Sequence, residues 1–260
     1  MTLGKASAGR DGGARRIAGA LAWIGLCLAA ACSLAALGAG PGYRLGTWGL
    51  GAGFRILSWS TGLALLAALV SLVAMTLSIR AGARRFVAIG VAGLAIGIAT
   101  AGPPLYLYRE ATRLPKIHDI STDTENPPQF VAVLPLRKGA PNSVDYSATV
   151  AEQQKRAYPD IAPLLLDVPP AQAFAQAERV AREMGWDIVA AAPQDLRIEA
   201  TATTLMFGFK DDVVIRIAPH GAGSRLDIRS VSRLGSSDIG TNAKRIRTFV
   251  AKMKVLQSPA

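Results

Sequence analysis

Charged residues are scarce in this sequence. Only 18% of its 260 residues are charged, whereas 50% are hydrophobic and the mean hydropathy is +0.29. A soluble globular domain carries about 25% charged residues, so the composition excludes an ordinary soluble domain as the whole of the chain. It predicts a membrane protein, or a protein with a membrane-embedded part.

Cysteine is nearly absent as well. The two cysteines, Cys27 and Cys32, both fall in the first apolar run. Residues 33–260 therefore have no thiol, which excludes disulfides, thiolate zinc sites and thiol catalysis in the C-terminal part.

Acidic residues are almost missing from residues 1–108, which hold nine basic residues and one acid, Asp11. Residues 109–260 hold twenty basic and seventeen acidic residues, so most of the formal net charge of +11 belongs to the N-terminal part. A nucleic-acid-binding domain instead clusters its basic excess on one folded surface. We therefore expect no nucleic-acid partner.

Three apolar runs without acidic or basic residues are long enough to cross a bilayer, which takes about 20 helical residues. The predicted transmembrane helices are 17–39, 56–79 and 86–108, after a basic tail over residues 1–16. A cleavable signal peptide, or a lipoprotein signal at Cys32, is the alternative interpretation of the first run. Gly93 and Gly97 predict close packing among the three helices, with homodimerisation as the alternative.

Basic residues near the ends of these helices predict their orientation. Four precede the first helix and three lie between the second and third, against Arg44 and Arg55 between the first and second. The more basic side faces the cytoplasm. We expect a multi-pass inner-membrane protein with the lipid bilayer as partner, a cytoplasmic N-terminus and a periplasmic C-terminal domain.

Nine of the fifteen prolines lie between Pro115 and Pro170. This pattern predicts a connector over residues 109–168 that has little regular structure and packs on the domain. A short helix is expected from Ser147 to Arg156.

Regular patterns return in residues 169–260, the predicted α+β core. The expected elements are a helix from Pro170 that stops at Gly185, strands over 186–190, 196–203 (able to run on to Phe209), 213–217 and 225–233, and a helix with apolar positions from Ile239 to Met253. Lys210–Asp212 is expected to be a turn, and Ser236 or Ser237 to cap the last helix. The order predicts a two-layer α+β domain, an antiparallel sheet with helices on one face, behind an N-terminal three-helix transmembrane region.

One segment crowds polar residues between the last strand and the last helix. It runs Arg-Ser-Val-Ser-Arg-Leu-Gly-Ser-Ser-Asp-Ile-Gly-Thr-Asn over residues 229–242. Together with Phe-Gly-Phe-Lys-Asp-Asp (207–212), Thr-Asp-Thr-Glu-Asn-Pro-Pro-Gln-Phe (122–130) and Pro-Asn-Ser-Val (141–144), it resembles the domain of unknown function 1499 (DUF1499) family, as a membrane-anchored bacterial member. The resemblance covers roughly residues 117–250 and implies no activity. The family often has Asn-Cys-Val-Ser-Ser where this chain has Asn-Ser-Val-Asp-Tyr (142–146), so a thiol-dependent role is not expected.

The polar segment offers a hypothetical binding site for an anion such as a phosphate, a carboxylate or a lipid headgroup. Arg229 and Arg233 would neutralise the ligand, Ser237 and the helix N-terminus would donate hydrogen bonds, and Asp238 and Asn242 would orient the arginines. The alternative is a helix cap with structural Arg–Asp pairs.

A second hypothesis takes Asp211, Asp212 and Asp238 as metal ligands of an envelope hydrolase. His118 and His220 match no catalytic triad. The last helix also presents basic residues, which we interpret as a solvated face, with an anionic membrane surface as the alternative. They are Lys244, Arg245, Arg247, Lys252 and Lys254.

The sequence thus favours a non-catalytic binding or interaction module of the cell envelope, with an anionic lipid or an envelope protein as partner. No cofactor and no catalytic residue are predicted. The metal-dependent hydrolase and a purely structural domain are the alternatives.

Overall fold

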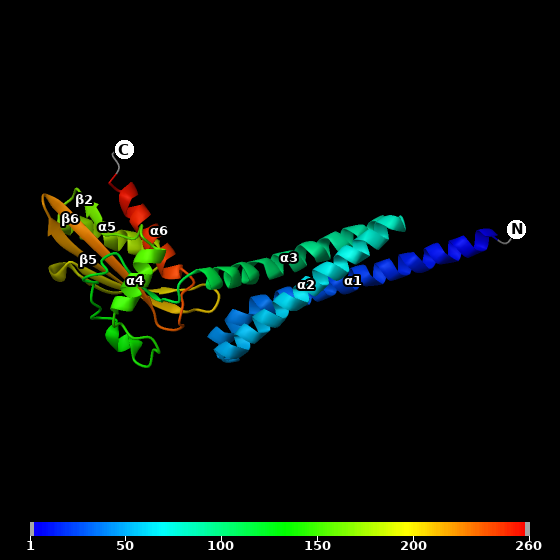
Figure 1. The fold of residues 1–260 in the computed structure, drawn as a ribbon, viewed down its shortest axis with the longest axis horizontal. Coiled ribbons are helices and arrows are strands. Elements are labelled where there is room, and N and C mark those ends of the chain that lie inside the picture. The colour runs from blue at the N-terminus through cyan, green and yellow to red at the C-terminus, as the bar shows by residue number, and fades with distance from the viewer. Residues whose placement is uncertain (1–2, 258–260) are drawn as a thin grey trace. The chain divides into compact units, whose positions relative to one another are not determined.

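The computed structural model describes residues 3–257, with side chains from residue 12 onward. It divides the chain into two compact units, with the boundary between Arg109 and Glu110. Figure 1 shows long helices in the first unit and a sheet with shorter helices in the second.

The first unit is built from three long helices: α1 (Leu3–Arg44), α2 (Leu50–Arg80) and α3 (Arg84–Arg113), the last of which runs on into the second unit. The segments Gly12–Arg44, Leu50–Arg80 and Arg84–Arg113 are each long and apolar enough to cross a membrane. All three predicted transmembrane helices fall within them. α1 runs past the predicted end at residue 39, through Pro41, to Arg44.

Glycines allow the three helices to approach closely. A Cβ on Gly93 would overlap Ser71 Oγ of α2 and lie 3.0 Å from the Leu26 nitrogen of α1. A Cβ on Gly97 would lie 2.8 Å from the Ala64 carbonyl oxygen of α2. Both glycines therefore face helices of the same chain, which confirms the predicted packing among the three helices.

The second unit is an α+β domain with an antiparallel sheet, as predicted. The sheet has six strands rather than the four expected, because two short segments of the connector also pair with it. The strands follow the order β1-β6-β5-β4-β3, and β2 also pairs with β6. Strand bounds are β1 (Asp119–Ser121), β2 (Leu164–Leu166), β3 (Asp187–Ala192), β4 (Arg197–Thr203), β5 (Lys210–His220) and β6 (Gly223–Ser232). The helices are α4 (Ala148–Ala157), α5 (Pro170–Glu183) and α6 (Thr241–Val255), with 3₁₀ turns η1 (Leu134–Arg137) and η2 (Pro193–Asp195).

The prediction of a turn at Lys210–Asp212 is wrong. β5 begins at Lys210, which pairs with Thr203 of β4, so the chain reverses over residues 204–209. The residues of this loop are mostly apolar, so the sequence pattern indicated that the strand continues. Gly208, with φ +67°, accommodates the reversal of the chain. Charged residues at the start of β5 are tolerated because both carboxylates meet arginines.

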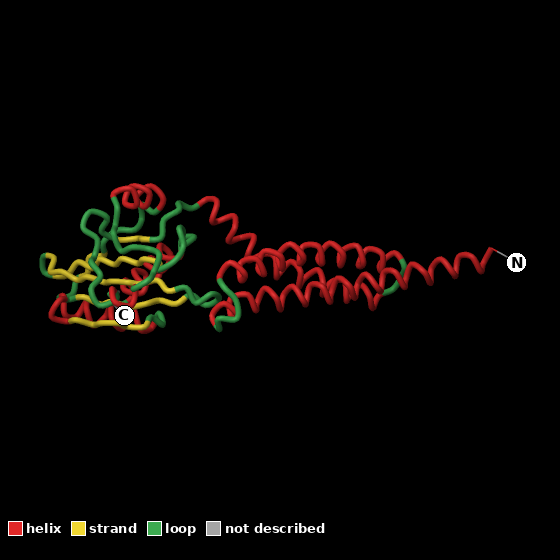
Figure 2. Tube along the Cα trace, turned by 90° about the horizontal axis from the view of Figure 1, so that it is seen from below, coloured by secondary structure: helices red, strands yellow, loops and turns green. Residues whose placement is uncertain are grey.

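Both faces of the sheet are covered. One face carries the aliphatic side chains of β4, β5 and β6 and packs on α5 and α6, with Phe174 and Phe249 in the shared core. The other face is covered by the connector, whose Phe130 and Val133 contact Val214 and Val231. Figure 2 shows long loop segments, drawn green, running alongside the strands.

Candidate functional site

Arg229 of β6 is fully buried and has partners for its whole guanidinium group. Its Nε and Nη2 donate to the two carboxylate oxygens of Asp119 at 3.0 and 2.6 Å. The remaining hydrogen bonds go to the carbonyl oxygens of Pro128, at 3.2 Å, and Val144. The Phe130 ring lies 5.2 Å from the guanidinium carbon. Arg229 thus forms a structural Arg–Asp pair.

Arg233 is held in a similar way. It donates to both carboxylate oxygens of Asp212 at 2.9 and 2.7 Å and to the Leu136 carbonyl oxygen at 3.0 Å. Arg137 of η1 donates to the same carboxylate at 2.6 Å, and Thr201 donates at 2.8 Å.

The charge state of Asp212 follows from this cluster. Burial raises the pKa of the Asp212 carboxyl, but the hydrogen bonds from Arg233, Thr201 and Arg137 outweigh burial and hold the pKa below its ordinary value. Asp212 is therefore an ionised carboxylate shared by two arginines.

Asn242 belongs to a separate cluster on the helix side of the sheet. Its Nδ2 donates to the His118 carbonyl oxygen and to Ser232 Oγ, both at 3.0 Å, and its Oδ1 accepts a hydrogen bond from Ser230 Oγ at 2.6 Å. Arg245 of α6 also donates to Asn242 Oδ1 and forms an ion pair with Asp211 at 2.6 Å. Asn242 thereby ties the first turn of α6 to the end of β6.

The predicted cap at Ser236 or Ser237 is wrong, because α6 begins only at Thr241, after Gly240 with φ +74°. Asp238 accepts hydrogen bonds from the Gly240 nitrogen at 2.9 Å and from the Asn242 nitrogen at 2.8 Å. Burial raises the pKa of the Asp238 carboxyl, and these backbone hydrogen bonds only partly offset the effect. The acceptor at the N-terminus of α6 is thus the chain's own Asp238 carboxyl group.

The five predicted ligand residues therefore divide between two faces of the sheet. Arg229 and Arg233 lie on the connector side with their carboxylate partners. Asp238 and Asn242 lie together at the start of α6, and Ser237 Oγ accepts a hydrogen bond from the Ile239 nitrogen.

The three aspartates of the hydrolase hypothesis do not converge on one site. Neighbouring residues of a strand point to opposite faces, so Asp211 meets Arg245 on one side of the sheet and Asp212 meets Arg137 on the other. Within the described residues, no group of three or more His, Cys, Asp or Glu side chains is placed to hold a metal ion.

Sequence reasoning missed a buried carboxylate on the connector side. Glu199 of β4 is fully buried and accepts hydrogen bonds from the backbone nitrogens of Val131, Ala132 and Val133 at 3.0–3.1 Å. Arg197 donates to it at 3.0 Å. The signal in the sequence that could have indicated this contact was the apolar run over residues 130–134, because apolar side chains of a connector pack against another surface of the domain.

A second missed cluster joins the connector to β5 and β6. Asp123 and Asp227 both accept hydrogen bonds from Arg216 and Arg225, with distances of 2.8–3.0 Å for the closest contact of each pair. The connector side of the sheet thus holds a layer of ion pairs.

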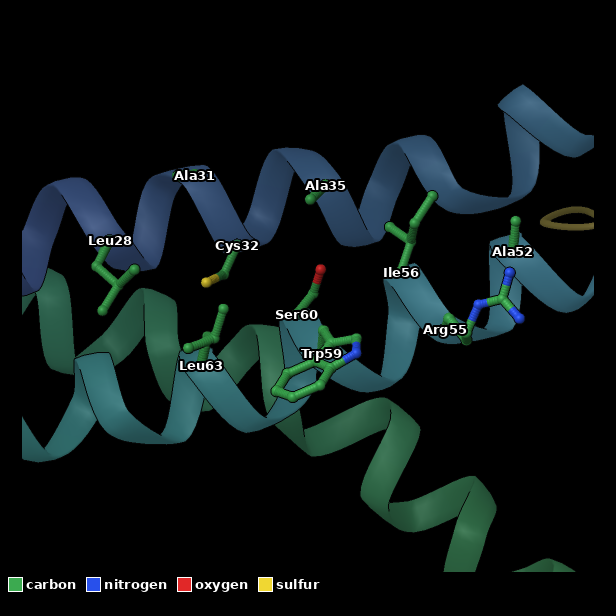
Figure 3. A pocket seen from close by; sticks show the side chains of 10 residues that line it. All are labelled: Leu28, Ala31, Cys32, Ala35, Ala52, Arg55, Ile56, Trp59, Ser60 and Leu63. Atoms are coloured by element: carbon green, nitrogen blue, oxygen red, sulfur yellow. The ribbon is translucent and has the colours of Figure 1, made fainter. Parts of the chain in front are cut away.

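Several hollows lie in the described part of the chain. One, about 530 Å³, is in the helical unit between α1 and α2, where apolar side chains such as Leu28 and Leu63 line it and Arg55 lies toward one end (Figure 3). Cys32 also lines it. None of the predicted site residues does.

Another hollow, about 280 Å³, lies beside the first turns of α6. Its lining combines Trp186 with two basic and three hydroxyl side chains, and it has no acidic residue. The polar residues that line it are Thr203, Thr241, Lys244, Arg245 and Thr248.

Comparison with known proteins identifies the family. The crystal structure of TTHA0849 from Thermus thermophilus is 11% identical, with a TM-score of 0.25 over 37% of this chain and 97% of that one. No curated protein matches this chain. Residues 119–253 match the family described as Protein of unknown function (DUF1499). This match includes the whole sheet, the clusters of ion pairs on its two sides and most of α6. The chain belongs to the DUF1499 family.

Proposed function

We propose that this protein is a multi-pass protein of the inner membrane whose α+β domain is a non-catalytic binding module of the cell envelope for an anionic ligand. The apolar length of α1, α2 and α3 supports the anchor. The seven basic residues before the first span and between the second and third support a cytoplasmic N-terminus and a periplasmic domain.

The hollow beside α6 is the observation that carries the binding proposal. Lys244 is exposed there, and Arg245 adds a second cationic group that is held in place by Asp211. Hydroxyl groups next to an ammonium group suit a phosphate or carboxylate oxygen. Trp186 supplies an apolar wall, stacked on Phe249 at 5.5 Å. At about 280 Å³ the hollow suits a small anionic group rather than a drug-sized molecule.

The ion-pair layer supports a non-catalytic role. Asp212 is held ionised by Arg137 and Arg233. On the helix side of the sheet, Asp238 accepts hydrogen bonds from the backbone nitrogens of Gly240 and Asn242. Groups held in this way act as framework rather than as acids or bases. The ligand contacts predicted for Arg229, Arg233, Ser237, Asp238 and Asn242 stay a prediction, and none of these five residues lines the hollow.

Trp186 provides the test. We replace Trp23, Trp48 and Trp59 with phenylalanine in the full chain, which leaves Trp186 as the single indole, and titrate the detergent-solubilised protein with inorganic phosphate. We expect a saturable change in fluorescence. Lys244→Gln should weaken binding about tenfold, because a hydrogen bond to a charged group contributes about 1.5 kcal/mol.

Lys252→Gln is the matched control, since it removes the same charge from α6 outside the hollow and should leave binding unchanged. Nanodiscs with phosphatidylglycerol or with phosphatidylcholine distinguish a lipid headgroup from a free anion. A headgroup ligand changes Trp186 emission only in phosphatidylglycerol and blocks the phosphate titration, whereas a free anion binds equally in both. The absence of any saturable response in detergent and in both nanodiscs would contradict the proposal.

A further inference from the structure

The loop between β4 and β5, residues 204–209, exposes apolar side chains in a fixed conformation. Leu205 is 91% exposed and Met206 is 38% exposed. The Thr204 nitrogen donates to the Phe209 carbonyl oxygen at 2.8 Å, and the Gly208 nitrogen donates to the Thr204 carbonyl oxygen at 3.0 Å. These hydrogen bonds therefore fix the loop in a conformation in which Leu205 and Met206 remain exposed.

The register of the sheet shows which end carries this loop. Thr203 pairs with Lys210, Asp211 pairs with Ser232, and Val231 pairs with Asp119 at the start of β1. The start of β1 and the β4–β5 loop therefore lie at the same end of the sheet. The chain reaches β1 directly from α3.

The link between α3 and the sheet is short. α3 ends at Arg113 and β1 begins at Asp119, and even a fully extended chain of this length spans only about 20 Å. The β4–β5 end of the sheet is thus the end tethered close to the C-terminal end of α3. β5 is eleven residues long, so its opposite end lies about 33 Å away at 3.3 Å per residue.

Basic side chains accompany the apolar tip. Arg113 and Lys116 lie in or beside the link, and Lys210 follows the loop; all three are exposed. A basic residue near an anionic membrane surface contributes about 1 kcal/mol of attraction. Apolar side chains beside basic ones are the pattern with which a protein surface enters the interface of a bilayer.

We propose that the β4–β5 loop is a membrane-docking element: Leu205 and Met206 enter the interface of the bilayer that holds α1–α3, and the neighbouring basic residues contact lipid headgroups. This proposal rests on the membrane anchoring proposed above. It is independent of the anion-binding hollow.

Depth-dependent quenching tests the proposal in the full chain. Cys27 and Cys32 are replaced with alanine, one cysteine is introduced by Leu205→Cys or, in a second protein, Met206→Cys, and an environment-sensitive fluorophore is attached. The proteins are reconstituted in phosphatidylcholine–phosphatidylglycerol vesicles that contain lipids spin-labelled near the headgroup end of the acyl chain, or, for position 69, lipids spin-labelled near the end of the acyl chain at the bilayer centre. Ala222→Cys, in the exposed turn at the opposite end of β5, is the matched control, and Leu69→Cys on the exposed side of α2 reports anchoring.

We expect the fluorophore at positions 205 and 206 to be quenched several-fold more than at position 222, with blue-shifted emission. Equal quenching at positions 205, 206 and 222, with strong quenching at position 69, would overturn the docking proposal and leave the anchoring intact. Quenching at none of the four positions would overturn the anchoring and the docking together.

Discussion

Removal of the guanidinium group of Arg229 should strongly destabilise the α+β domain. Arg229→Met keeps an elongated side chain but leaves the carboxylate of Asp119, which is 2% exposed, without its cation. Breaking a buried ion pair on one side costs about 3–5 kcal/mol. The carbonyl oxygens of Pro128 and Val144 lose their donor as well, so we expect the cost to lie toward the upper end of that range.

The double variant Arg229→Met/Asp119→Leu separates charge from packing. If the uncompensated carboxylate dominates the cost, removing it as well should recover much of the lost stability, because replacing both members of a buried pair with apolar residues is often close to neutral. The Arg247→Met variant is the control. Arg247 makes an equally well-formed ion pair with Asp160, at 2.6 Å, but both side chains are about half exposed, so its loss should cost less than about 1 kcal/mol.

Urea unfolding of the detergent-solubilised full chain, followed by Trp186 fluorescence in the single-tryptophan background, measures these costs. Trp186 is buried against Phe249, so its emission reports the domain and not α1–α3. If Arg229→Met costs no more than Arg247→Met, the framework role assigned to Arg229 is refuted. If the folded Arg229→Met protein binds phosphate as the parent does, the direct ligand contact predicted for Arg229 is refuted instead.

Two further predictions follow from the clusters and the helix packing. The folded-state pKa of Asp212 lies below its ordinary value of about 3.9, so its ionised form contributes stability above that pH that is lost as the pH falls through the folded pKa. In urea unfolding from pH 7 to pH 3, Asp212→Asn should be less stable than the parent at neutral pH, and the difference should shrink toward acid. Gly97→Ala should lower the SDS concentration that unfolds the helical unit, followed by far-UV circular dichroism, because its Cβ would lie 2.8 Å from a backbone oxygen of α2. Gly102→Ala, with no atom within 4 Å of its Cβ, should not.

The elements that could be predicted from sequence are those whose signal is local. The apolar runs are long and carry no acidic or basic residue, so length alone identified α1, α2 and α3. Pro170 and Gly185 mark the two ends of α5, because proline favours the first turn of a helix and glycine favours the position just after its end. The local signal misplaced the β4–β5 turn. Here apolar residues occupy the loop and Asp211 and Asp212 occupy the strand, which reverses the usual pattern.

The partners within the candidate site could not be predicted in this way. Arg229 pairs with Asp119, 110 positions earlier in the chain, and Glu199 binds backbone nitrogens 66 to 68 positions away. Alternation along a strand tells which residues share a face, but not what covers that face. The connector covers the polar face of β4, so that Glu199 and Thr201 are buried there and belong to the ionic layer.

The ionic layer also determines where the tether of the domain begins. Asp119, Asp123 and Arg137 of the connector are paired with arginines and a carboxylate of the sheet, so these connector segments are part of the folded domain. Ile117 and His118 are bound to the domain as well, because the Asp238 nitrogen donates to the Ile117 carbonyl oxygen and the Ser232 nitrogen donates to the His118 carbonyl oxygen. Only residues 114–116 remain as a link between α3 and the domain. A link this short restricts how far the β4–β5 end of the sheet can move from the end of α3. Weak contacts of Leu205 and Met206 with lipid then suffice for docking. The tether already keeps the loop near the bilayer, so docking loses little further translational entropy.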